Sequence, residues 1–342
     1  TEPRVVGRGE RSGAEPNVPT GRGERSGARE RGGDVGEYTD GVGHPYSNRR
    51  AGSFPASVMF VTEDHGPAYV ASAPTWSAQQ VLDGPGGCMS ICSLPDSGRM
   101  FGIFRCFPGY RFQSAGVFEI KTEPDRPLWK VERVFDLPFA HRLVAVGRGG
   151  RNFLIAASLA EDKASPDDWS TAGTVYALPY DAKGNIDSSS AQIVLSDLFR
   201  NHGMLVSTFQ GREYLLISGA EGVFATALSE SSERWEWQRW LEHETSEIVL
   251  VDADGDGVEE LVTIAPFHGN RLTVYRMESD RWQEIAGYEV DFGHGLWGGT
   301  ILGQPAVVVS NRSGSGDLYL YHGDGERGLR SEPLVIDGGV GA

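Results

Sequence analysis

Residues 202–218 read HGMLVSTFQGREYLLIS, and this stretch contains the pattern on which the fold depends. A histidine opens an apolar run, Gly211 follows nine residues later, and a second apolar run ends seven residues after that at Ser218. Two short apolar runs on either side of a glycine predict two strands joined by a tight turn. The stretch therefore predicts a β-hairpin.

The same spacing occurs three more times along the chain. The copies begin at Met89, His141 and His294, and each reaches a glycine nine residues later. A fifth copy begins near Glu247, where a two-residue insertion holds an acidic loop, residues 252–257. The copies start roughly 45 to 60 residues apart, a period typical of β-propeller blades and too long for most helical solenoids. Because equivalent positions of the blades converge on one axis, these starts predict a common site.

The repeat predicts an all-β fold, a β-propeller formed by residues 56–342. We expect six blades, with seven as the alternative. Residues 336–342 are similar to the opening of another blade, so the last blade is either incomplete or completed by strands from residues 57–72. Residues 1–55 differ in composition, because the octapeptide GRGERSGA occurs twice and large apolar side chains are scarce. Such a segment cannot repay the entropy of ordering, which predicts a disordered low-complexity tail.

Composition excludes several classes of partner. The formal net charge of −16 argues against nucleic acid, whose phosphates need a basic surface. The charge does not exclude an acidic substrate, because a local pocket can oppose it. No apolar run approaches the ~20 residues of a membrane span, which argues against a membrane. The three cysteines, Cys88, Cys92 and Cys106, are too few and too clustered for a disulfide framework. Together with the lack of a recognisable signal peptide, this favours a cytoplasmic location.

The acidic loop carries oxygen ligands at a spacing that suits calcium. Asp252, Asp254 and Asp256 alternate, and the Val258 carbonyl and the Glu260 carboxylate follow at positions seven and nine. Hard oxygen ligands at such intervals are typical of Ca²⁺ loops. The flanking segments are strand-like rather than helical, so the loop joins two strands of a hairpin. The alternative is a solvated Asp-Gly hairpin without a metal.

This loop resembles the calcium-binding loops of integrin-type FG-GAP and VCBS repeat propellers, which the other blades match only in their spacing. The resemblance implies a structural Ca²⁺ that fixes a turn, and it implies no reaction. Propellers of this type include polysaccharide lyases, and the sugar dehydratase that acts on aldos-2-uloses is similar at the level of the blade. Likeness of fold does not by itself determine function.

Strand direction sorts the candidate residues onto two faces of the propeller. The start of the first strand of a blade and the loop after its second strand lie on the same face, because the two strands are antiparallel. The acidic loop follows a first strand, so we expect it on the opposite face. Histidine is the commonest metal ligand and changes its protonation near neutral pH, and arginine binds carboxylates. The residues predicted to share the chemical face are His141, His202, His294, Arg105, His268 and Arg312.

Three functions are compatible with this face. The first, which we prefer, is a lyase or dehydratase acting on an acidic or oxidised sugar, small or polymeric. In it His202 abstracts a proton, and Arg105 and Arg312 hold the carboxylate. The second makes His141, His202 and His294 ligands of Zn²⁺ or another divalent metal. The third is a non-catalytic, calcium-stabilised propeller that binds a protein or a glycan. A narrow pocket favours an enzyme, and an open plateau favours binding.

Overall fold

The computed structural model describes residues 56–95, 97–122, 128–229, 232, 234–326 and 328–339. The predicted tail, residues 1–55, lies outside the described residues. The regular structure of the described part consists of 23 strands and one short 3₁₀ helix, η1 (Ser188–Ser190). None of its helices is long and apolar enough to cross a membrane.

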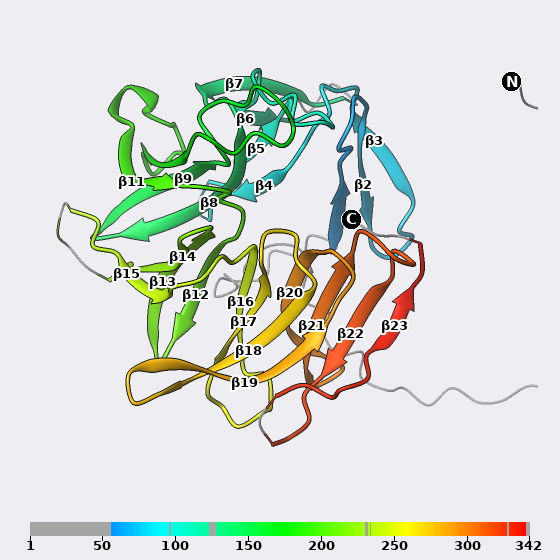
Figure 1. The fold of residues 1–342 in the computed structure, drawn as a ribbon. Helices are drawn as coiled ribbons and strands as arrows, with labels where there is room; N and C mark the ends of the chain where they lie inside the picture. The colour runs from blue at the N-terminus through cyan, green and yellow to red at the C-terminus, as the bar shows by residue number, and fades with distance from the viewer. Residues whose placement is uncertain are drawn as a thin grey trace, which may run out of the picture. The chain divides into compact units, whose positions relative to one another are not determined.

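The strands form six antiparallel sheets, which are the blades of a six-bladed β-propeller (Figure 1). The first blade has three strands and each of the others has four, and neighbouring strands in a blade follow one another in the sequence. The strands of the first three blades are β1 (Ser57–Phe60), β2 (Ala68–Ser72), β3 (Ala78–Leu82); β4 (Ser90–Ser93), β5 (Met100–Phe104), β6 (Gly116–Lys121), β7 (Lys130–Asp136); β8 (Ala140–Arg148), β9 (Arg151–Ser158), β10 (Gly173–Tyr180) and β11 (Gln192–Leu198).

The last three blades follow the same plan. Their strands are β12 (Met204–Phe209), β13 (Arg212–Gly219), β14 (Gly222–Ala227), β15 (Gln238–Leu241); β16 (Glu247–Val251), β17 (Glu260–Ala265), β18 (Arg271–Glu278), β19 (Arg281–Glu289); β20 (Gly293–Ile301), β21 (Gln304–Asn311), β22 (Leu318–His322) and β23 (Leu334–Asp337). The predicted hairpin of residues 202–218 is the pair β12–β13, with Gly211 in its turn.

The blades follow one another around the axis in chain order. The first strands of consecutive blades, β4, β8, β12, β16 and β20, contact each other in that sequence. Hydrophobic clusters fill the spaces between neighbouring blades: Ile155 of the third blade packs with Leu215 of the fourth, and Val262 of the fifth with Val307 of the sixth. Because each middle strand is covered on both faces, its buried residues are consecutive rather than alternating, as along β17.

The six-bladed fold is confirmed, but the expectations about the two ends of the propeller are wrong. Leu334–Asp337 does not open another blade, because it pairs with β22 and completes the sixth blade as its fourth strand. The segment 57–72 does not complete that blade either; its strands pair with each other and with β3. A first blade of three strands lacks the full repeat, so the spacing of the other blades could not place it.

Two glycines with positive φ, Gly211 and Gly222, differ in how closely a neighbouring strand approaches them. A Cβ added to Gly222 would lie 1.9 Å from the carbonyl oxygen of Leu241, whereas one added to Gly211 would meet nothing within 4 Å. Gly211→Ala should lower the free energy of unfolding by about 1 kcal/mol, the cost of a left-handed alanine. Gly222→Ala adds the displacement of β15 and should lower it by about 3 kcal/mol in urea denaturation. Equal decreases in the free energy of unfolding for the two variants would show that β15 can move away from β14 at no energetic cost.

Candidate active site

A cavity of about 250 Å³ lies at the end of the propeller axis where the first strands of the blades begin. Every blade contributes to its wall, from the first to the sixth, through Glu63, Tyr110, His141, His202, His268 and His294. The cavity is therefore a product of the ring as a whole and not of any single blade.

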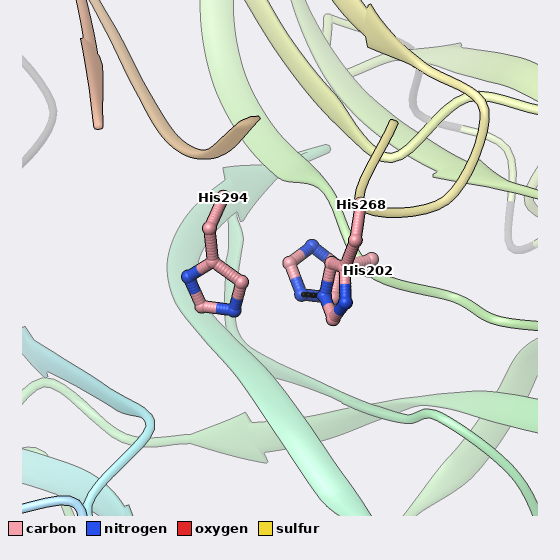
Figure 2. Close-up of side chains that lie close together, drawn as sticks. All are labelled: His202, His268 and His294. Atoms are coloured by element: carbon pink, nitrogen blue, oxygen red, sulfur yellow. Dashed lines mark hydrogen bonds between the residues drawn. The ribbon is translucent and has the colours of Figure 1, made fainter. Parts of the chain in front are cut away.

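The four cavity histidines form one cluster. The rings of His141 and His202 lie 4.5 Å apart, measured between centroids, and those of His268 and His294 lie 4.7 Å apart. The His202 ring is 4.7 Å from that of His268 and 5.4 Å from that of His294. Figure 2 shows His202, His268 and His294 turned toward one another. The three histidines of the sequence register and His268 from the loop after β17 thus share one centre.

β-Bulges turn two of these histidines toward the axis. The pairing of β8 with β9 shifts by one residue between Ala140 and Arg142, at His141. The pairing of β20 with β21 shifts in the same way between Gly293 and Gly295, at His294. A bulge interrupts the regular alternation of side chains and redirects the extra residue, and such bulges are common beside functional sites.

The buried carboxylate of Glu247 contacts His202 of the cluster and the side chain of Arg142. Its Oε1 lies 2.6 Å from Nδ1 of His202 and 2.5 Å from Nη2 of Arg142. The three side chains come from the fifth, fourth and third blades, respectively. Arginine can only donate and an ionised carboxylate can only accept, so Nδ1 of His202 donates to Glu247. Nε2 of His202 is then free to accept a hydrogen bond from Nε2 of His268, 3.1 Å away.

Arg312 anchors the other side of the cluster. Its Nη2 donates to both carboxylate oxygens of Glu63, at 2.7 and 2.9 Å, and its Nη1 lies 3.2 Å from Nε2 of His294. This ion pair joins the sixth blade to the first at the rim of the cavity. Both guanidinium groups of the centre, those of Arg142 and Arg312, are therefore balanced by carboxylates.

Burial keeps the four imidazoles neutral. It lowers the pKa of His141 and His202 well below the ordinary value, with the charge of Arg142 as the next cause. Burial also lowers the pKa of His268 to about 4 and, together with the neighbouring His268, that of His294 to about 3. It raises the pKa of Glu247. At neutral pH the cavity consequently presents imidazoles in the form that accepts a proton or binds a metal.

Arg105 is the predicted site residue that the structure does not bring to the cluster. It is exposed, and its guanidinium lies over the ring of Phe118, 5.8 Å from the ring centroid. The backbone amide of Arg105 donates to the carbonyl of Gly86, and Arg105, directly after β5, has a left-handed φ of 69° rather than that of a strand.

Sequence reasoning missed other residues of the centre. Arg142 stands next to a register histidine, but only the bulge at His141 lets both side chains take part, and a bulge is not visible in the spacing. Glu63 lies in the blade that the repeat did not reach. Glu247 gave a signal, because it occupies the register position that holds histidine in three other blades.

The acidic loop lies on the opposite face, as the strand direction requires, because Glu247 and Asp252 flank the two ends of β16. Carboxylate oxygens of Asp252, Asp254 and Glu260 lie within 4.8 Å of one another, so three of the four expected carboxylates converge, whereas Asp256 is not part of this group. The Val258 amide donates to Asp256, which closes the turn. The fit to calcium is disturbed by a further side chain, the guanidinium of Arg276, which lies among these carboxylates.

A second group of possible metal ligands lies in the cavity itself. His202, His268 and His294 each offer a ring nitrogen within 4.8 Å of the others. The carboxylate of Glu247 stands behind His202, in the way that an outer carboxylate orients a metal-binding imidazole. His141 is not part of this group, although the sequence register placed it there.

Solved structures share the fold, whereas no family model and no curated protein matches the chain. A "putative 6-phosphogluconolactonase" from Bacteroides fragilis NCTC 9343 is 11% identical, with a TM-score of 0.53 over 85% of this chain and 83% of that one. One of the same description from Bacteroides uniformis ATCC 8492 is 10% identical, with a TM-score of 0.54 over 82% of each chain. A functionally unknown protein from Desulfotomaculum acetoxidans DSM 771 is 11% identical, with a TM-score of 0.52 over 82% of this chain and 85% of that one. At such identities the likeness shows the propeller fold alone.

Removing the carboxylate of Glu247 should be far more damaging than removing that of Glu63. Glu247→Ala leaves Arg142 without its buried partner, and we expect the free energy of unfolding to fall by about 3–5 kcal/mol. The matched variant Glu63→Ala breaks an ion pair whose side chains are 36% and 47% exposed, and the loss should stay below about 1 kcal/mol. Chemical denaturation measures both. Similar losses would show that Glu247 does not organise the centre.

Proposed function

We propose that this propeller is a carbon–oxygen lyase or dehydratase that acts on an acidic or oxidised sugar in the histidine-lined cavity. The observation that supports it most is a chain of proton carriers, Glu247, His202 and His268, which ends at the cavity wall. Consecutive members lie 2.6 and 3.1 Å apart, within hydrogen-bond reach. A chain of this kind accepts a proton from a bound molecule and shares it with a buried carboxylate.

The geometry changes the role expected for His202. Its side chain is only 1% exposed, and both ring nitrogens face protein groups, so it is poorly placed to meet a substrate. His268 is half-buried and lines the cavity, which makes it the better base. In this proposal His202 is a positioning residue that passes charge between His268 and Glu247.

The reaction balances with the groups in the cavity. His268 takes the proton from the carbon beside the carboxylate or carbonyl, and the electron pair of that C–H bond becomes a C=C bond. The C–O bond on the next carbon breaks, and the departing oxygen takes a proton. Tyr110 is the candidate donor, because it lines the same cavity and burial raises its pKa, which keeps its hydroxyl protonated.

The Arg312 side chain and the shape of the cavity support a small anionic carbohydrate as substrate. Arg312 stands at the cavity wall, and a guanidinium is suited to hold a carboxylate and the enolate that develops from it. A cavity of about 250 Å³ favours a reaction on one or a few sugar units over a flat binding surface. The names of the two Bacteroides proteins also support a sugar-derived substrate.

A metal-assisted form of the same reaction is the second candidate. It is favoured by the three convergent nitrogens of His202, His268 and His294. Neutral imidazoles are suited to Zn²⁺ and related divalent metals, which stabilise a developing enolate as Lewis acids. Arg312 now contacts His294 and would have to turn aside for such an ion.

The first test is turnover of uronate-containing oligosaccharides, followed by the ultraviolet absorbance of an unsaturated product. His268→Ala should lower kcat/KM by about 10²–10⁴-fold, the usual contribution of a general base. The matched control is His322→Ala, on β22 and outside the cavity, which should retain full activity. If no substrate gives an unsaturated product but a sugar lactone is hydrolysed, the lyase proposal fails and a lactonase replaces it.

Metal content separates the two forms of the proposal. If a metal assists, the purified protein should carry a divalent transition metal in mass spectrometry, and His268→Ala should lose it while His322→Ala keeps it. Glu247→Gln should lower the affinity for the metal by about 10–100-fold, the usual effect of changing a residue that hydrogen-bonds to a metal ligand. Active protein without a transition metal would exclude the metal-assisted form and leave the imidazole base.

A further inference from the structure

Arg276 stands where a calcium ion would have to bind in the acidic loop. Its Nη2 lies 2.5 Å from Oδ2 of Asp254, 2.6 Å from Oε1 of Glu260 and 3.2 Å from Oδ2 of Asp256. Its Nε makes a further bond of 2.9 Å to Glu260. Calcium binds carboxylate oxygens at about 2.3–2.6 Å. An ion held by Asp254 and Glu260 and this nitrogen would therefore compete for one position.

The remaining carboxylate oxygens already have donors. Both oxygens of Asp252 accept from loop amides, those of Gly255 and Gly257. The second oxygen of Glu260 accepts from Ala253. The second oxygens of Asp254 and Asp256 accept from the next amides but one along the loop. Seven of the eight oxygens of the four carboxylates thus accept hydrogen bonds from the protein, and the eighth, Oδ2 of Asp256, is ion-paired with Arg276.

Burial makes the position of the guanidinium decisive. The side chains of Asp254 and Glu260 are 1% and 0% exposed, and that of Arg276 is 18% exposed. Carboxylates removed from water to this degree require a nearby positive charge, and their loss of hydration is compensated only by close, hydrogen-bonded pairing. In this chain the charge comes from the third strand of the same blade.

We infer that Arg276 is the permanent cation of the acidic loop and replaces the calcium ion that loops of this kind bind. The loop keeps the arrangement of a calcium site, while a guanidinium on β18 performs the neutralising and turn-fixing role of the metal. The fifth blade is consequently independent of calcium, and chelators leave the protein intact.

The inference predicts that calcium dependence appears when Arg276 is removed. Wild-type protein should show the same melting temperature in EDTA and in millimolar CaCl₂, and calorimetric titration with CaCl₂ should show no binding. Arg276→Ala should melt at a lower temperature in EDTA, because Asp254 and Glu260 lose their partner. Saturating CaCl₂ should then raise its melting temperature by about 5–10 °C.

The matched control lies on the same strand. Arg271 pairs with Glu284 on the surface, with side chains 54% and 47% exposed, so Arg271→Ala should change neither stability nor the response to calcium. Calcium binding by the wild-type protein, with a higher melting temperature, would overturn the inference, and this titration needs no variant to fold. Destabilisation of Arg276→Ala without rescue by calcium would also overturn it, since the loop would then lack the ligand arrangement of a calcium site.

Discussion

The centre of this propeller depends on one buried carboxylate, that of Glu247. Inner strands of a propeller begin near a common axis, so a single side chain there can reach several blades. Glu247 from the fifth blade contacts His202 from the fourth and Arg142 from the third. Because His202 then meets His268, this carboxylate orients the imidazoles of the cavity as well as the blades that carry them.

The two ends of strand β16 use the same electrostatic solution. At one end Glu247 is buried against the guanidinium of Arg142, and at the other Glu260, on the adjacent strand β17, is buried against that of Arg276. Arginine suits both positions, because its planar fork bonds several carboxylate oxygens and its charge is permanent. The first end has a cavity and, among the described residues, a buried imidazole nitrogen without a hydrogen-bond partner, Nδ1 of His141. At the other end the carboxylates are paired with loop amides and with Arg276. The histidine cluster and the acidic loop are thus separated by the length of one strand.

Much of the site could be predicted, because the number of residues between a side chain and the turn glycine gives its position along the strand. The distance of His141, His202 and His294 from their turn glycines places all three at one level of the ring. The direction in which a side chain points cannot be predicted from this spacing, since it depends on how the strands pair locally. The bulge at His141 brings Arg142 into the centre, and Arg105 follows β5 in a left-handed backbone conformation that the spacing does not reveal.

Ion pairs between neighbouring strands could not be predicted from the sequence either. Arg276 reaches Glu260 because Leu261 pairs with Tyr275 in the β17–β18 ladder, and that register is set by the loop around His268. The three-stranded first blade hid Glu63 for a related reason, since it lacks the spacing by which the other blades were recognised.

The histidine cluster is difficult to explain by stability alone. Burial lowers the pKa of all four imidazoles, so protons taken up by the unfolded chain below about pH 6.5 favour unfolding. Nδ1 of His141 is buried without a hydrogen-bond partner among the described residues, a cost of about 1–3 kcal/mol. Met89 occupies the same register position in the second blade and lines the same cavity, so an apolar side chain is compatible with this position. The imidazoles therefore carry costs that packing does not require, as expected of groups placed for chemistry.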